Sequence, residues 1–194
     1  GSEAGSWFAN AVYSITSFTA SFNYVATGGA GDPADGLAFV LQNSTAGVHA
    51  LGDSGGYLGY GFNAGSTDSG TAISPSAAIE FNLYSPYGQG TAFETNGITG
   101  IGGAIYQSTS PVDFWNGDPM NVVVSYNGIG FDVPWLNGEF MREGLTPPSP
   151  FKNVDLYRVF RRNARFISHK LDYVAGAILG RNKLPTGGHQ LWVD

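Results

Sequence analysis

A carboxylate and a pair of glycines have the residue types that a binding site for a polar ligand needs. Asp35 lies at the start of a hydrophobic run, and Gly55 and Gly56 follow in a glycine-rich stretch. A fixed carboxylate only accepts hydrogen bonds, and a loop without side chains lets the backbone approach a polyol. These residues therefore predict polyol binding, with an ordinary turn aspartate ahead of a strand as the alternative for Asp35.

Aromatic residues near these positions would complete such a site. Tyr57 follows the glycine pair directly, and Tyr60, Tyr84 and Tyr87 are further candidates to stack on the apolar face of a sugar ring. The alternative for these tyrosines is a place in the core or at the rim of the domain. Asn82 is a candidate for a polar contact with the ligand.

Two-residue alternation of side chains predicts strands in the part of the chain that holds these residues. One face of the first strand carries Phe18, Ala20, Phe22 and Tyr24, and similar runs occur at 37–41, 79–83 and 120–126. Clusters of Gly, Ser, Asn, Asp and Pro separate the runs and predict turns. Because helical spacing is missing before residue 130, we predict a β-sandwich or jelly roll.

After residue 132 the pattern becomes that of an α/β segment. A helix is predicted over 134–143, with Pro134 at its start and Gly144 after its end. Residues 153–157 predict a short strand. A second helix is predicted from Ser168, as its cap, through Ile178, with Gly180 closing it.

Charge divides the chain at the same place. Residues 1–131 hold nine acidic residues and no Lys or Arg, whereas residues 132–194 hold all nine basic residues and six acidic ones. The alternative is one domain with an acidic and a basic face. Because phosphate binding depends on Lys and Arg, nucleic acid is a possible partner of the basic part and not of the acidic part.

Two classes of feature are missing from the composition. There is no cysteine, which excludes a disulfide framework and a cysteine-based zinc site. No run of about 18 apolar residues occurs either, so we predict no membrane span.

Six short motifs follow one another between residues 34 and 128. They are ADGLAFVL at 34–41, ALG at 50–52, GGYLGY at 55–60, AIEFN at 78–82, GDPMNV at 117–122 and SYNG at 125–128. In content and order they resemble legume lectins and their bacterial L-type relatives. The resemblance implies a concanavalin A-like jelly roll in which Asp35 accepts hydrogen bonds from two sugar hydroxyls. The backbone of Gly55 and Gly56 would donate beside it, and glycans would be the partners.

The metal site of plant lectins is not matched. The family pattern has a Glu, an Asp two residues later, and then Asn, Asp and His, and the bound Mn and Ca hold the binding loops in place. Here only Glu80 agrees, because Asn82 replaces the first Asp and glycine or proline stands where later ligands would be. Since hard cations need several charged oxygens, we predict no bound metal ion, with Glu80 and Asp132 as weak candidates at most.

A further set of motifs begins where the first set ends. YNGIGFD at 126–132 is followed by PSPF at 148–151, VDLY at 154–157, HKLDYVA at 169–175, LG at 179–180 and Lys183. These residues resemble the second motif, Asn-x-x-x-Phe-Asp, and later text of DEDD 3′–5′ exonucleases of the B-family polymerase type, which are RNase H-like. The resemblance implies Asp132 as a catalytic ligand of Mg or Mn in a two-metal site.

The acidic set of such an enzyme is incomplete. Lectin-like sequence replaces the first acidic motif, and the third would lie beyond residue 194, so we predict a catalytically incomplete fragment and lean against an enzyme. Asp155 and Asp172 are interpreted as a strand-end cap and a helix-surface charge. Four arginines either follow a phosphate backbone or form a solvated helix face: Arg158, Arg161, Arg162 and Arg165.

The sequence therefore predicts a mainly β chain. A C-terminally truncated lectin-like sandwich over 1–128 would be followed by a partial α/β, RNase H-like segment over 129–194, fused at the text shared by both resemblances. The leading hypothesis is a non-enzymatic carbohydrate-binding module, which favours a secreted or cell-surface protein. The alternatives are a 3′–5′ exonuclease, which favours the cytoplasm, and a structural surface domain without a ligand.

Overall fold

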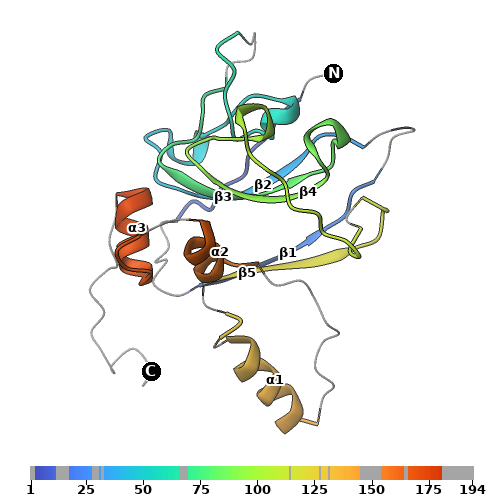
Figure 1. The fold of residues 1–194 in the computed structure, drawn as a ribbon, viewed down its shortest axis with the longest axis vertical. Helices are drawn as coiled ribbons and strands as arrows, with labels where there is room; N and C mark the ends of the chain where they lie inside the picture. Colours follow the sequence, from blue (N-terminus) through green and yellow to red (C-terminus); the bar gives the residue numbers. More distant parts are fainter. Residues whose placement is uncertain are drawn as a thin grey trace. The chain divides into compact units, whose positions relative to one another are not determined.

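The computed structural model describes residues 3–11, 18–27, 31, 33–65, 70–113, 115–126, 128–130, 132–144, 154–163 and 166–180. The chain forms two compact units (Figure 1). Unit 1 consists of Gly1–Val12, Tyr24–Met120 and Ile178–Gly180. Unit 2 consists of Tyr13–Asn23, Asn121–Ala177 and Arg181–Asp194.

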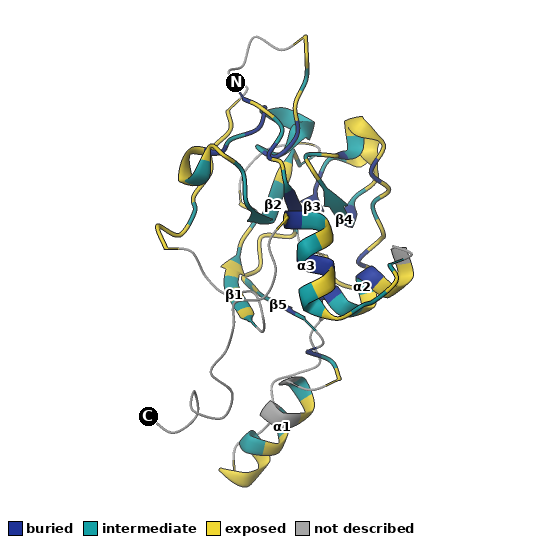
Figure 2. Ribbon diagram, turned by 90° about the vertical axis from the view of Figure 1, so that its left-hand side faces the viewer, coloured by how far each residue is buried: buried dark blue, intermediate teal, exposed yellow. Residues whose placement is uncertain are grey.

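Unit 1 is built on a three-stranded antiparallel sheet. Its strands are β2 (Gly36–Gln42), β3 (Ser76–Asn82) and β4 (Gly90–Thr95), in the order β2-β3-β4. Phe39 pairs with Ile79, and Ile79 pairs with Phe93, so large apolar side chains share one face of the sheet. The central strand β3 is buried along its whole length (Figure 2).

A buried hydrophobic cluster lies at the other face of this sheet. Ala50, Tyr60, Ile73 and Ala78 form a buried cluster, and Phe8, Ala38 and Val40 pack against it. The Tyr60 hydroxyl, which cannot be buried cheaply without a partner, is hydrogen-bonded to Ser76 Oγ at 2.8 Å. The described residues of unit 1 also include four short 3-10 helices in the loops around these strands: η1 (Gly47–His49), η2 (Gly55–Tyr57), η3 (Ser85–Tyr87) and η4 (Gly100–Gly102).

Unit 2 combines a second small sheet with helices. The strands β1 (Thr19–Tyr24), β5 (Met120–Ser125) and β6 (Val154–Asp155) lie in the order β1-β5-β6, and β5 is parallel to β6. The helices are α1 (Asp132–Arg142), α2 (Leu156–Asn163) and α3 (Leu171–Leu179). The path from β5 through α1 to β6 is a β-α-β connection, which parallel strands require.

Aromatic rings hold unit 2 together. The Tyr126 ring lies 6.0 Å from the Tyr157 ring and 6.3 Å from the Phe160 ring, measured between centroids. The Tyr126 hydroxyl also donates a hydrogen bond of 2.6 Å to the backbone oxygen of His169. Phe160 is buried and Tyr126 and Tyr157 are half-buried, so these contacts tie α2 and the segment before α3 to the end of β5.

Most of the predicted elements are confirmed. The runs at 18–24, 37–41, 79–83 and 120–126 become β1, β2, β3 and β5, and the helix at 134–143 becomes α1. Gly144 and Gly180 adopt the left-handed conformation, with φ values of 70° and 65°, as expected of glycines that close helices. The chain is thus sheet-rich with a few helices.

The expected truncated jelly roll is not shown by the structure. The described residues form two three-stranded sheets. The strand β5, expected as a late sandwich strand, pairs with β1 and with the α/β strand β6.

Among the described helices, none is both long enough and apolar enough to cross a bilayer.

Candidate functional site

The structure brings Asp35 and Gly55 together in unit 1. Asp35 directly precedes β2, and its backbone oxygen accepts a hydrogen bond of 2.9 Å from Leu83 N just after β3. Gly55 has φ of 64°, and a Cβ atom built on it would lie 3.9 Å from Asp35 Oδ2. The half-buried position of Asp35 raises the pKa of its carboxyl group through desolvation. Two residues singled out by type therefore lie side by side.

A tightly bonded loop presents Gly55. Gly52 N donates to Gly59 O at 2.7 Å, and Gly59 N donates to Asp53 O at 2.9 Å, which closes the loop on itself. The buried carboxylate of Asp53 accepts a hydrogen bond of 2.7 Å from Asn63 N. A Cβ atom on Gly52 would lie 2.5 Å from the backbone of Tyr60, so this turn requires glycine.

Two side chains, Tyr87 and Ile101, pack against Gly56 and form what we call the apolar wall. A Cβ atom on Gly56 would lie 2.8 Å from Tyr87 Cε2 and 3.0 Å from Ile101 Cδ1. Both side chains keep part of their surface in solvent, since Tyr87 is 38% exposed and Ile101 42%. The carboxylate, the bare backbone and a partly exposed aromatic ring thus occur within one stretch of surface.

Asn82 holds the loop of Tyr87 in place through its side-chain amide. Its side chain is buried, and Nδ2 donates hydrogen bonds of 2.8 Å to the backbone oxygens of Tyr84 and Gly88. Those bonds close the loop that contains η3 and therefore fix Tyr87. Asn82 was expected to touch the ligand, and the structure instead gives it these two loop contacts.

The remaining tyrosines have different surroundings. Tyr60 is a core residue, as the alternative for these side chains stated. The Tyr57 ring lies against Gly61, where a Cβ atom would be 3.1 Å from Tyr57 Cδ1. Tyr84 contacts Tyr87 edge to face, with 5.5 Å between the ring centroids. Sequence reasoning missed Ile101, because an isolated isoleucine between glycines carries no local signal.

Glu80 is occupied by a hydrogen bond within the fold. Its side chain is buried, and Tyr106 Oη donates to Glu80 Oε2 at 2.6 Å. Burial raises the pKa of Glu80 to about 8, the hydrogen bond from Tyr106 lowers it in part, and the charge of Glu94 raises it. Glu80 Oε1 has no hydrogen-bond partner among the described residues.

The donor set around Glu80 does not fit a resident metal ion. Both hydrogen bonds of the neighbouring Asn82 amide go to backbone oxygens. In the described ranges no group of three or more His, Asp or Glu side chains gathers as ligands would. Hard cations need several charged oxygens, whereas the described residues at this point supply the single carboxyl group of Glu80, which is already bonded to Tyr106.

Three aspartates of unit 2 were considered in the sequence: Asp132, Asp155 and Asp172. Asp155 is buried and caps α2, because Oδ1 accepts from Tyr157 N at 3.0 Å and Oδ2 accepts from Ile129 N at 3.1 Å. The interpretation of Asp155 as a strand-end cap is confirmed. Asp172 lies in the first turn of α3. Asp132 is the first residue of α1, and its side chain lies outside the described part of the structure.

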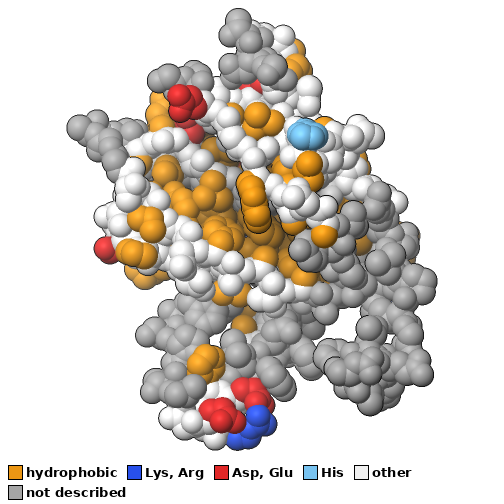
Figure 3. Space-filling model, turned by 180° about the vertical axis from the view of Figure 1, so that it is seen from behind, with side chains coloured by type: hydrophobic (Ala, Val, Ile, Leu, Met, Phe, Trp, Pro, Cys, Tyr) orange, Lys and Arg blue, Asp and Glu red, His pale blue; other side chains and the backbone are white. Residues whose placement is uncertain are grey.

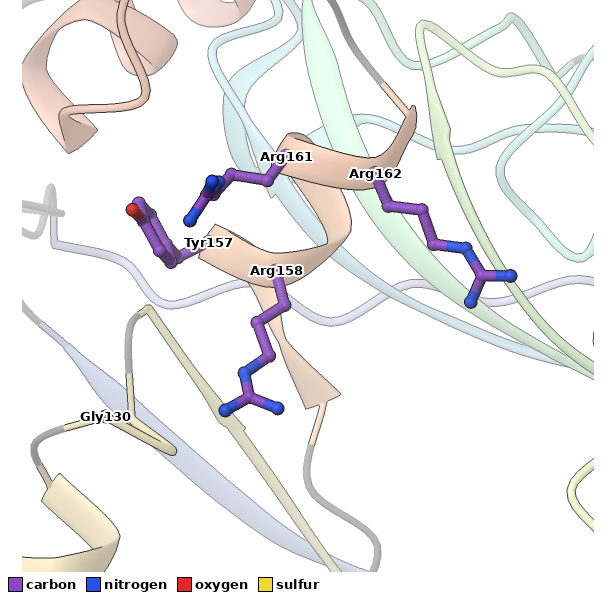
Figure 4. A pocket seen from close by; sticks show the side chains of 5 residues that line it. All are labelled: Gly130, Tyr157, Arg158, Arg161 and Arg162. Carbon is purple, nitrogen blue, oxygen red and sulfur yellow. The ribbon is translucent and has the colours of Figure 1, made fainter.

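Arginines of α2 surround a shallow pocket of about 460 Å³ in unit 2 (Figure 4). Its lining consists of Gly130, Tyr157, Arg158, Arg161 and Arg162. The guanidinium carbon of Arg161 lies 5.7 Å from the centroid of the Tyr157 ring, a cation–π contact. Arg161 extends beside the Tyr157 ring, whereas Arg158 and Arg162 point away from that ring. Arg165 falls outside the described residues.

Comparison with known proteins bears on the same part of the chain. Residues 104–190 match the model of the RNase H superfamily. The C-terminal part of the chain is therefore RNase H-like, as the motifs from residue 126 onward indicate. The match begins upstream of those motifs and lies wholly after the Asp35, Gly55 and Tyr87 positions. It gives the lectin resemblance no support. No curated protein and no solved structure matches the chain.

Proposed function

We propose that unit 1 is a non-enzymatic carbohydrate-binding module whose site is centred on Asp35. The observation that carries the proposal is the position of the Asp35 carboxylate beside the bare backbone of Gly55. A saccharide needs hydrogen-bond acceptors for its hydroxyls and an apolar surface for its C–H face. Asp35 supplies the first, and Tyr87 with Ile101 supplies the second.

The charge of unit 1 restricts the ligand to neutral sugars. Its ranges contain no Lys or Arg, so a sialic acid, uronic acid or sulfate group would meet Asp35 without a basic side chain to offset the repulsion. On the face drawn in Figure 3, apolar side chains gather over the described part of unit 1, with acidic residues and a histidine beside them. We therefore expect neutral hexoses to bind more tightly than anionic glycans.

Exchange of Asp35 for asparagine tests the proposal. Asp35→Asn keeps the size of the side chain but removes its charge and half of its acceptor capacity. Hydrogen bonds to charged groups contribute about 1.5–3 kcal/mol each, so losing one of the two expected bonds should weaken affinity about 10- to 100-fold. Calorimetric titration with a panel of neutral and sialylated saccharides measures this effect.

A matched control is available in the same unit. Asp118 is exposed and accepts a hydrogen bond from Asn116, and it lies in another loop. Asp118→Asn makes the same chemical change and should leave affinity unaltered. If the wild-type protein is folded and binds none of the saccharides, or if Asp35→Asn binds as well as wild type, the proposal is wrong.

The RNase H superfamily match favours a second candidate function, binding of single-stranded nucleic acid by unit 2. Arg161 lies over the Tyr157 ring, and Arg158 lines the same pocket on α2 (Figure 4). Arginines neutralise phosphates, and a tyrosine ring stacks on bases without regard to sequence. Because Asp155 serves as a helix cap, the described acidic groups do not form a two-metal site, and we expect binding without cleavage.

Paired substitutions on α2 test this candidate. Arg158→Ala with Arg161→Ala should weaken binding of a fluorescent oligonucleotide and lower the salt dependence of its affinity by about two phosphate contacts. Arg142→Ala, on the exposed end of α1, is the control. Release of nucleotides with Mg or Mn that Asp132→Asn abolishes would contradict the non-catalytic interpretation, and unchanged binding by the double variant would remove the α2 site.

A further inference from the structure

A partly buried hydrogen-bonded bridge connects the sheet of unit 1 with the loop next to the proposed site. Tyr106 Oη donates to Glu80 Oε2 at 2.6 Å and accepts from Gly100 N at 3.1 Å. Glu80 lies in the central strand, where Ala38 and Ala92 are its partners on either side. These small neighbours leave room for the carboxyl group and the tyrosine hydroxyl on this face of the sheet.

The tyrosine end of the bridge is anchored independently. Gln107, the next residue, pairs with Thr91 of β4 through two backbone hydrogen bonds of 2.8 and 3.0 Å. The backbone at Tyr106 is therefore fixed to the sheet, and its side chain extends back to Gly100. A Cβ atom on Gly100 would lie 2.7 Å from Tyr106 Cε2 and 3.1 Å from Tyr87 Cβ. Gly100 is thus packed between the two tyrosines.

The bridge ends at the apolar wall. Gly100 begins η4, and the next residue, Ile101, packs over Gly56 beside Tyr87. Displacement of η4 would therefore move Ile101 away from the proposed site. A carboxylate that is already bonded to a tyrosine does not need a cation to hold this loop in place.

We propose that Tyr106 is a positioning residue that anchors η4 to Glu80, so that the wall of the saccharide site is held without a metal ion. This inference rests on the proposed carbohydrate-binding function for its effect on affinity. Its effect on η4 itself can be measured without any ligand.

Tyr106→Phe removes the hydroxyl and keeps the ring that packs on Gly100. Gly100 N then loses its acceptor, and a hydrogen bond of this kind contributes about 0.5–1.5 kcal/mol. We expect amide exchange of Gly100 and Ile101 in the ligand-free protein to become about tenfold faster, and affinity for the best-bound neutral saccharide to fall by a similar factor. Glu80→Gln keeps an oxygen that accepts from Tyr106 and should retain slow exchange and tight binding.

Two controls separate the bridge from general stability and from metal binding. Tyr126→Phe removes a tyrosine hydroxyl of unit 2 that is bonded to the backbone oxygen of His169, and it should leave exchange at η4 unchanged. Wild-type exchange and affinity should be the same in EDTA as in added Ca²⁺ and Mn²⁺. Unchanged exchange in Tyr106→Phe, or a cation effect on η4, would overturn the inference. Absence of saccharide binding by wild type would refute the proposed function but leave the exchange result to decide the bridge.

Discussion

At the level of single residues, the proposed site depends on where the fold places two carboxyl groups, those of Asp35 and Glu80. Asp35 lies half-buried beside Gly55, whereas Glu80 is buried and bonded to Tyr106. Both pKa values are raised, chiefly by burial. Asp35, the proposed acceptor for a ligand, therefore remains in contact with solvent, whereas Glu80, which is bonded to Tyr106, is buried.

The raised pKa of Glu80 predicts how stability depends on pH. A carboxyl group with a pKa of about 8 in the folded state and 4.5 when unfolded binds more protons when folded. Between these values stability therefore falls as pH rises, by at most about 1.4 kcal/mol per pH unit. Below 4.5 its stabilising contribution is fully present, and above 8 it is lost.

Urea unfolding of unit 1 between pH 5 and pH 9 measures this dependence. Glu80→Gln carries no titrating group, so its stability should be flatter over the range than that of wild type. Glu94, whose pKa burial also raises, remains in both proteins and cancels from the comparison. Identical pH profiles for the two proteins would show that Glu80 does not titrate in this window.

Residues of the site differ in how far the sequence could reveal them. Asp35, Gly55 and Gly56 could be singled out as candidates from the sequence, because a carboxylate before a strand and adjacent glycines are local patterns. Asn82 was predicted as a ligand contact, but only the fold shows that its amide closes the loop of η3. Tyr106 and Ile101 were missed, because their roles depend on Glu80 and Gly56, which are distant in sequence.

At the scale of elements, the proposed site depends on how η2 packs against η3 and η4. Gly56 is the point of closest approach, because Tyr87 and Ile101 both lie where its side chain would be. Of the strands that carry these loops, β2 and β3 were predictable from two-residue alternation. The strand β4 was missed, since Gly90 at its start and the small residues Thr91 and Ala92 give no clear apolar alternation.

Gly56→Ala tests the packing of these short elements. The added methyl group would lie 2.8 Å from the Tyr87 ring, which must then move away. We expect saccharide affinity to fall about tenfold or more and the tyrosine fluorescence or ring NMR signals of the ligand-free protein to shift. Gly5→Ala, where no atom lies within 4 Å of the new methyl group, should bind as wild type does. Equal affinity in both variants would remove Gly56 from the site.

At the scale of the whole molecule, the two units differ in chemistry as well as in fold. Unit 1 contains no Lys or Arg, and unit 2 holds every basic residue of the chain. The strand β5 contains Val122 to Ser125, within the text that both resemblances share, and it has β1 on one side and β6 on the other. The expected fusion at this point stays a prediction, which reading the encoding DNA across codons 120–135 on an unbroken molecule would check.

The central claim is that a saccharide binds where Asp35 meets the Gly55 loop. The most direct measurement is an NMR titration of the labelled protein with neutral saccharides, followed amide by amide. We predict saturable shifts concentrated at Asp35, Gly55, Gly56, Tyr87 and Ile101, and their loss in Asp35→Asn. A titration that leaves these amides unmoved, or moves amides of the α2 pocket instead, would contradict the central claim.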